Sequence, residues 1–290
     1  MNTLACVLAI GKFDGIHKGH LEVLRKALSF DKNLKKGVVT FEPSPYEVLY
    51  PNKIYYNLTN NDQKITMLKN LGFDFVSILP IDKNFLTISH NNFAHMLKEK
   101  FLAKHVVIGE DFRFGKDALG DVEFLKNFSE DLIIHPVSCA LFNNKKISSS
   151  RTKKALLQSD FLSATSMLGR NFSISGRVIK GQTLGASLGF RTANLAININ
   201  YPLTYGVYAT LTKINNEYFK SISNFGLRPT ISNTREVFLE THILDKTLEL
   251  YDCHIEIFFM SKIREEIKFP SRIALVTQIN KDILVRRNII

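Results

Sequence analysis

The chain has 290 residues, of which 45% are hydrophobic and 22% charged. These values are typical of a globular protein with two domains of ordinary size or one large one. No apolar run approaches the roughly 20 residues that span a bilayer, and the apolar start lacks the basic region and cleavage site of a secretion signal. Three widely separated cysteines argue against a disulfide framework or a zinc knuckle. A reducing cytoplasm is therefore the expected location.

The net charge of +11 is unevenly distributed along the chain. Residues 1–150 carry 19 basic and 16 acidic side chains, whereas residues 151–290 carry 19 and 11. This balance favours anionic partners, either nucleic acid or phosphorylated small molecules. No block of five or six consecutive basic residues is present, which argues against a flexible nucleic-acid arm.

The most informative segment follows the first expected strand, residues 5–10. It reads G-K-F-D-G-I-H-K-G-H over residues 11–20 and opens a helical pattern over 19–29. His17 and His20 are three residues apart, so both imidazoles lie on one helical face. A helix start offers free N–H groups to phosphate, and Gly19 allows close approach. The segment predicts a nucleoside triphosphate site; a bare H-x-x-H alone is also compatible with a solvated turn.

The rest of the first half alternates apolar runs with helical patterns, which indicates parallel βαβ units with helices on both faces of the sheet. Ligands bind such sheets beyond the carboxyl ends of the strands, where residues 11–20 lie. Further strands are expected at 37–41, 74–79, 105–109 and 132–137, and helices at 61–71, 90–103, 121–128 and 149–168.

Three later segments of this half complete the candidate site. T-F-E-P-S-P at 40–45 ends the second strand, and V-I-G-E-D-F-R-F-G at 107–115 follows the fourth. I-S-S-S-R at 147–151 places consecutive hydroxyls at a helix start, where they can cap the helix and donate to phosphate oxygens. Taken singly, each is also compatible with a proline-stiffened loop, a solvated charged loop or a simple serine cap.

From Phe172 the pattern changes to short strands, expected at 172–180, 205–214, 217–225, 237–244 and 254–262. Asn215-Asn216 suits a tight hairpin turn, and Ser271 is an expected N-cap for a last helix. These elements predict a small antiparallel barrel that ends in a helix. The domain boundary is expected near 165–171, which divides the chain into 1–168 and 169–290.

The second half also contains three motifs: G-A-S-L-G-F-R-T-A-N at 185–194, N-F-G-L-R-P-T at 224–230 and L-E-T-H at 239–242. By strand alternation, Glu240 shares a face with Phe238 and Leu244, and apolar neighbours of this kind raise the pKa of a carboxylate. An outward glutamate on a barrel strand is the alternative interpretation.

Across nearly its whole length, and in the same order, the chain resembles the bifunctional bacterial riboflavin kinase/FAD synthetases. The resemblance implies a Rossmann-like nucleotidylyltransferase domain that transfers an adenylyl group from ATP to FMN, and a barrel that phosphorylates riboflavin. It assigns charge stabilisation to His17 and His20 and the role of general base to Glu240. It assigns nucleotide binding in the first domain to Gly11, Phe13, Asp14, Gly15, Gly19, Asp111, Arg113, Ser149, Ser150 and Lys153. In the barrel it assigns ATP and flavin binding to Gly185, Gly189, Thr192, Asn194 and Arg228, with Thr192 and Asn194 also binding magnesium.

The chain departs from the family pattern at six positions. Lys12 stands where relatives often have asparagine, Ser44 where they commonly have histidine, and Ser150 where they have threonine. Lys153 replaces an arginine, which keeps the charge but loses the planar fork that grips phosphate. Arg191 replaces a proline, which would preset the metal-binding turn, and Ala186 replaces a flap arginine; both departures concern the kinase step.

Adenylyl transfer needs no covalent enzyme intermediate, so the protein is expected to position the reactants and neutralise developing charge. Positive histidines, basic side chains, helix N-termini and Mg²⁺ on the polyphosphate would supply that. The expected ligands are riboflavin, FMN and ATP, without nucleic acid or membrane. Two alternatives stay open: an FAD synthetase whose barrel only binds flavin, and a basic RNA-binding protein on a nucleotide-binding scaffold.

Overall fold

The computed structural model describes residues 5–180, 189–229, 235–246 and 248–289, and contacts divide the chain into two compact units. One unit extends to Tyr55 and from Asn61 to Ser149; the other contains Tyr56–Asn60 and the chain from Ser150 onwards. Asn57 N–H donates to the Asn200 carbonyl (2.8 Å) and the Asn60 amide to the Ser175 carbonyl (3.0 Å), so a short segment from the first half belongs to the second unit.

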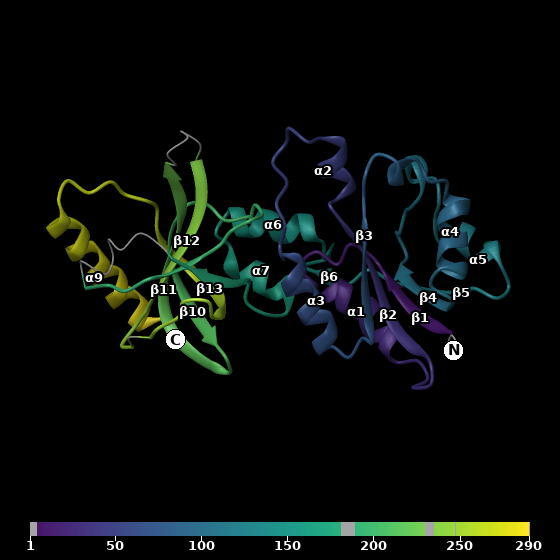
Figure 1. Cartoon of the computed structure of the whole chain (residues 1–290), viewed down its shortest axis with the longest axis horizontal. Coiled ribbons are helices and arrows are strands. Elements are labelled where there is room, and N and C mark those ends of the chain that lie inside the picture. The colour runs from purple at the N-terminus through teal and green to yellow at the C-terminus, as the bar shows by residue number, and fades with distance from the viewer. Residues whose placement is uncertain (1–4, 181–188, 230–234, 247, 290) are drawn as a thin grey trace. The chain divides into compact units, whose positions relative to one another are not determined.

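The first unit is built on a five-stranded parallel sheet with the order β3-β2-β1-β4-β5 (Figure 1). The strands are β1 (Cys6–Ile10), β2 (Lys35–Glu42), β3 (Phe75–Pro80), β4 (Ala103–Gly109) and β5 (Ile133–Val137). The helices are α1 (Lys18–Leu28), α2 (Pro45–Leu49), α3 (Asn61–Asn70), α4 (His90–Glu99) and α5 (Val122–Phe128), with 3₁₀ turns at Phe85–Thr87 and Lys116–Ala118 and a hairpin of β6 (Leu141–Phe142) and β7 (Lys145–Lys146). The predicted parallel sheet is therefore confirmed.

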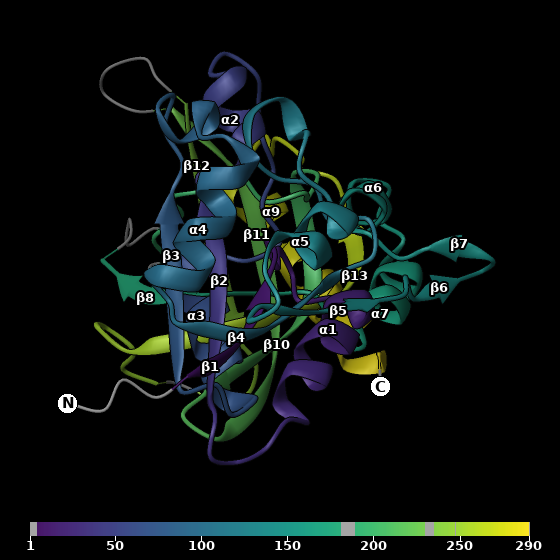
Figure 2. The ribbon, with the colours of Figure 1, turned by 90° about the vertical axis from the view of Figure 1, so that its right-hand side faces the viewer.

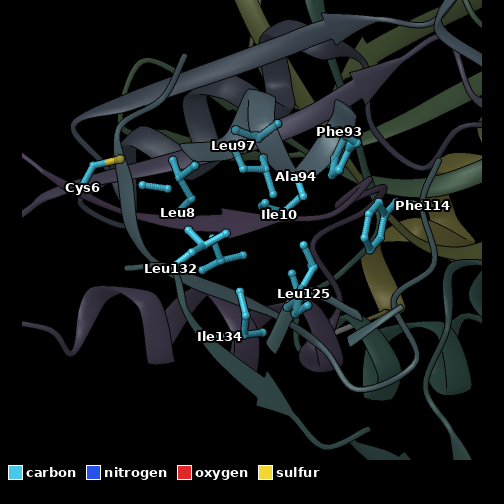
Figure 3. Packing of buried hydrophobic residues seen from close by; sticks show 14 of the residues in the cluster. Cys6, Leu8, Ile10, Phe93, Ala94, Leu97, Phe114, Leu125, Leu132 and Ile134 are labelled. Atoms are coloured by element: carbon cyan, nitrogen blue, oxygen red, sulfur yellow. The ribbon is translucent and has the colours of Figure 1, made fainter. Parts of the chain in front are cut away.

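Both faces of this sheet are buried, as its continuous apolar strands predict. Strand β1 sends Leu8 and Ile10 into a cluster with the α4 residues Phe93 and Leu97 (Figure 3). The alternate β1 residues join the opposite cluster, which contains Leu24 of α1 and Leu68 of α3. Helices thus cover both faces, and α1 and α4 can be followed in Figure 2. The arrangement fixes the carboxyl end of β1, where the G-K-F-D-G loop begins.

The second unit is a closed antiparallel barrel with strand order β10-β11-β12-β9-β8-β13. Its elements are α6 (Ser149–Leu157, whose first residue belongs to the first unit), α7 (Phe161–Leu168), β8 (Ser173–Ile179), β9 (Ala193–Leu195), β10 (Gly206–Ile214), β11 (Glu217–Pro229), β12 (Arg235–Ile243), β13 (His254–Arg264) and α9 (Arg272–Asn288). Asn215 adopts a positive φ of 54° in the predicted hairpin turn, and the Ser271 side chain accepts the Ala274 N–H as an N-cap. The barrel, the turn and the capped last helix are confirmed.

The helix expected over 149–168 is instead two helices. Ser159 has a φ of +57°, and Asp160 caps the second helix by accepting the Ser163 N–H at 3.0 Å. The apolar periodicity continues across the break, but the backbone turns there and restarts. The strand β9 and the short helix α2 were not expected.

Candidate active sites

The loop between β1 and α1 has an unusual backbone. Phe13, Gly15 and Ile16 have φ values of 49°, 80° and 40°, and the two non-glycine residues are fully buried. Such a conformation persists only where the surroundings hold it. The Gly11 N–H donates to the Val39 carbonyl (3.1 Å), and the Thr40 hydroxyl donates to the Lys12 carbonyl (2.8 Å). Strand β2 therefore holds the loop that leads to the two histidines.

The two imidazoles lie together, as their spacing predicts. His17 is the N-cap of α1, and its Nδ1 accepts the His20 N–H at 3.2 Å. The rings stack with centroids 3.6 Å apart and 14° between their planes, and Phe13 meets His20 edge-on. Because Nδ1 of His17 accepts a hydrogen bond, a neutral His17 carries its proton on Nε2.

His20 is not the positively charged group that we expected. Desolvation, followed by the charges of His17, Lys64 and Lys146, holds the pKa of His20 well below 6.5. Its Nδ1 is buried without a hydrogen-bond partner within the part of the chain that the structure describes. His20 is therefore a neutral imidazole at pH 7, and it can act as a hydrogen-bond donor through the ring nitrogen that carries its proton.

Next to these histidines lies a cavity of about 710 Å³, a size that suits a small-molecule ligand. Eight of the predicted nucleotide-binding and catalytic residues line it: Gly11, Phe13, His17, Gly19, His20, Asp111, Arg113 and Ser149. Asp14 and Gly15 are buried in the loop instead. Ser150 and Lys153 belong to the second compact unit, so the cavity of the first unit is described without them.

The serine segment contacts the glycine loop directly. The Ser149 hydroxyl donates to the Asp14 carbonyl at 2.8 Å, and both Ser148 and Ser149 line the cavity. The hydroxyl predicted to donate to phosphate thus holds the loop in this structure. Two segments 135 residues apart in sequence form one wall of the cavity.

Charged side chains from the loop after β4 form another wall, and each pairs with an opposite charge. Asp111 forms an ion pair with Lys146, and Arg113 forms one with Asp121 at 2.6 Å. Lys146 also lines the cavity and contributes to the low pKa of His20. We did not expect Lys146 in the site; its place directly before the I-S-S-S segment was the available signal.

Gly115 ends this loop and is a sensitive position. Its φ is +73°, and a Cβ would lie 2.6 Å from the backbone nitrogen of His90. We expect Gly115→Ala to lower the free energy of unfolding by about 2–4 kcal/mol, because strain and crowding add. Urea unfolding of the variant and the wild type measures this difference in the free energy of unfolding. Gly72→Ala is the control, since Gly72 also has a positive φ (+106°) but its nearest neighbour is 4.0 Å away; equal losses in the two variants would contradict the crowding.

Lys12 and Ser44, two positions of departure from the family pattern, have structural roles. The Lys12 ammonium donates to the Tyr55 hydroxyl at 2.9 Å and lies 3.9 Å from a Glu47 oxygen. Ser44 caps α2, and the Glu47 carboxylate accepts the Ser44 N–H at 2.7 Å in a capping box. Both residues thereby hold α2 beside the site.

A second polar cluster lies on the barrel. Glu240 of β12 pairs in register with Asn194 of β9 on one side and with Asn224 of β11 on the other. Directly opposed residues of antiparallel strands point to the same face, so the three side chains form one row. Asn194 is 6% exposed, and Asn224 Oδ1 is buried with no hydrogen-bond partner within the described ranges.

The strand register differs from the expectation that Glu240 has the apolar neighbours Phe238 and Leu244. Phe238 shares its face, but Leu244 lies beyond the end of β12, and the cross-strand neighbours are amides. Leu239 and Thr241 face the barrel interior with 0% and 1% exposure. The raised pKa of Glu240 stays a prediction.

The loop before β9 carries Thr192, which is half-buried. The His242 ring donates from Nδ1 to the Arg191 carbonyl at 2.8 Å, so β12 holds this loop where relatives have proline. The Arg191 guanidinium pairs with Glu249 at 3.6 Å. Gly189 has a φ of +89° and open space around it. Gly185, Ala186 and the Arg228 side chain lie outside what the structure describes.

Cys6, Cys139 and Cys253 are all free thiols, as their spacing predicts. Within the described residues, no three His, Cys, Asp or Glu side chains are grouped as a metal centre would require. The same residues contain no helix that is long and apolar enough to cross a membrane.

Each half of the chain matches a known protein family. The FAD synthetase family model matches residues 1–151, and the riboflavin kinase model matches residues 168–290. A protein of Buchnera aphidicola subsp. Acyrthosiphon pisum named bifunctional riboflavin kinase/FMN adenylyltransferase is 38% identical, over 96% of this chain and 91% of that protein. The protein of the same name in Escherichia coli K12 is 35% identical, over 97% of this chain and 92% of that protein. A crystal structure named macrolide-efflux protein from Streptococcus pneumoniae is 29% identical and has a TM-score of 0.84, covering 99% of this chain and 95% of that one. The chain therefore belongs to the bifunctional riboflavin kinase/FMN adenylyltransferase family, with an FAD synthetase domain followed by a riboflavin kinase domain.

Proposed function

We propose that the cavity beside α1 is the site at which FMN is adenylylated by ATP. The observation that carries this is the convergence of His17, His20, Asp111 and Ser149 on one cavity from three separate segments. A phosphate oxygen of FMN attacks the α-phosphorus of ATP, the new P–O bond forms, and pyrophosphate leaves. The protein then has to align the two phosphates and stabilise the charge on the transferring group.

The two histidines suit that task as hydrogen-bond donors. His17 presents Nε2–H because its Nδ1 is already an acceptor, and His20 lines the same cavity. Hydrogen bonds to a charged acceptor are stronger than neutral ones. The N-terminus of α1 adds its free N–H groups and its dipole. Lys146, paired with Asp111, places an ammonium group at the same cavity.

We infer that the barrel phosphorylates riboflavin at the row of Asn194, Glu240 and Asn224. Glu240 takes the proton from the terminal ribityl hydroxyl, whose oxygen attacks the γ-phosphorus of ATP, and ADP leaves. The assignment rests on the register of the three strands and on the family's L-E-T-H segment. The domain division at 168/169 is part of this proposal.

Magnesium fits the donors present in the barrel. Thr192 and Asn194 offer hard oxygens, and the partnerless Oδ1 of Asn224 is a third oxygen in the same row. Mg²⁺ would neutralise phosphate charge and orient the transferring group. Removing divalent cations with EDTA should stop both FMN and FAD formation, and adding Mg²⁺ should restore both; FAD formation that persists in EDTA would contradict a metal requirement of that step.

A product-resolved assay tests the function. Riboflavin or FMN is supplied separately with Mg-ATP, and products are separated by chromatography. We expect FMN and then FAD from riboflavin, and FAD and pyrophosphate from FMN. FAD from FMN but never from riboflavin would establish the impaired-kinase alternative. RNA binding with a steep salt dependence and no flavin turnover would establish the RNA-binding alternative.

A further inference from the structure

A buried lysine lies below the adenylyl-transfer site and takes no part in the chemistry described so far. Lys64 is in the first half of α3, within a sequence, N-D-Q-K-I-T, that is typical of a solvated helix face. Lys64 as a whole is 1% exposed to solvent, and its side chain is 2% exposed. Lysines are almost never this buried unless their charge is paired, so the surroundings of Lys64 have to supply that charge.

Two carboxylates supply it. The Lys64 ammonium lies 3.6 Å from Glu42 Oε2, and its charge also interacts favourably with Asp14. Lys12 opposes this interaction from the same side. Glu42 is the last residue of β2, and Asp14 is 2% exposed within the loop between β1 and α1. One ammonium thus forms an ion pair at the end of β2 and is attracted by a carboxylate of the loop with the unusual backbone.

Asp14 connects this buried charge to the cavity. Its carbonyl accepts the Ser149 hydroxyl at 2.8 Å, while its carboxylate interacts with Lys64. Three residues further along, the same loop delivers the His17 cap that stacks on His20. Lys64 itself does not line the cavity, so it has no surface from which to contact a nucleotide.

We propose that Lys64 is a positioning residue for adenylyl transfer: its buried ammonium, paired with Glu42 at the end of β2 and attracted by Asp14, holds the 11–16 loop in the conformation that presents His17 and His20 to the substrate phosphates. The inference rests on the assignment of the cavity as the adenylyl-transfer site.

Replacing Lys64 by methionine keeps the length of the side chain and removes the charge. We expect kcat for FAD formation from FMN to fall about 10- to 100-fold, since small misplacements of catalytic groups have effects of this size. KM should change less, because Lys64 does not touch the ligand. FMN formation from riboflavin by the same protein should be unchanged, and it reports that the variant is folded.

A pH profile separates this role from simple stabilisation. The groups that lower the pKa of His20 are His17, Lys64 and Lys146, together with desolvation. Removing one of these positive charges raises the pKa of His20. The proposal takes neutral His20 as the form that binds substrate, so the acid limb of kcat/KM for FAD formation, which reports the free enzyme, should move to higher pH in Lys64→Met.

Lys36 provides the matched control. It is a buried lysine at the opposite end of β2, 8% exposed, and its ammonium donates to the carbonyls of Asp31 (2.5 Å) and Leu34 (2.8 Å). Lys36→Met therefore costs buried hydrogen bonds without changing the charge near His20. The acid limb of the pH profile of Lys36→Met should therefore lie at the same pH as in the wild type.

A second variant covers the case in which Lys64→Met does not fold. Lys64→Met/Glu42→Gln removes both partners, so less uncompensated charge stays buried; it should fold, form FMN, and show the same fall in kcat for FAD formation, because the loop has lost the ammonium. A wild-type kcat in either folded variant, or a wild-type acid limb in Lys64→Met, would overturn the proposal, and so would a loss no larger than that of Lys36→Met. His20→Ala is assayed in parallel: full FAD formation there would refute the cavity assignment itself.

Discussion

His20→Ala should lower FAD formation from FMN by about 10²–10³-fold, the usual effect of removing one donor that stabilises developing charge. The imidazole lines the cavity proposed for adenylyl transfer and stacks on His17, so we expect it to donate a hydrogen bond to the transferring phosphate. FMN formation from riboflavin should be unchanged. The measurement is the rate of each product from its own flavin, with saturating Mg-ATP.

His105→Ala is the control for this variant. His105 is another half-buried histidine of the first unit, and its Nδ1 lies 3.1 Å from Nε2 of His135, away from the cavity-lining residues. It should keep both rates. Equal loss of both products in a folded His20→Ala variant would contradict the assignment of the two steps to separate sites.

Glu240→Gln should lower FMN formation from riboflavin by about 10²–10⁴-fold, the range for loss of a general base. Glutamine keeps the shape of the side chain, and its amide can still lie between Asn194 and Asn224 in the strand register, but it cannot take the ribityl proton. FAD formation from supplied FMN should continue at the wild-type rate. Both rates come from the same protein preparation.

Glu217→Gln is the matched control on the barrel, because Glu217 is an exposed residue at the hairpin between β10 and β11. It should retain the kinase rate. If Glu240→Gln phosphorylates riboflavin as fast as Glu217→Gln does, the general base is another group and the row of Asn194, Glu240 and Asn224 has only a structural role.

Much of the fold was predictable because its signals are local. The strands of the first unit are continuous apolar runs since they are buried on both faces. Asn215 at the hairpin and Ser271 at the last helix act through neighbouring backbone groups. The histidine spacing likewise predicted that the two imidazoles face the same way, which the stacked rings confirm.

What could not be predicted depends on residues distant in the sequence. Strand β9 has three residues, and only its pairing with β8 and β12 makes it a strand. Lys64 could not be identified from the sequence as a buried charge because Glu42 and Asp14, which interact with it, come from other segments. The prediction of a positively charged His20 was wrong for a similar reason: burial and the charges of His17, Lys64 and Lys146 lower its pKa, and burial is a property of the folded chain. A motif identifies the groups of a site, whereas tertiary packing decides their protonation.

The most direct test of two separate sites on one chain is a mixing experiment. His20→Ala and Glu240→Gln are each supplied with riboflavin and Mg-ATP, alone and then together. Alone, the first should accumulate FMN and the second should form no product; together they should form FAD, because FMN released by one is adenylylated by the other. A mixture that forms no FAD, while Glu240→Gln still converts supplied FMN, would show that the chain does not release FMN between two independent sites.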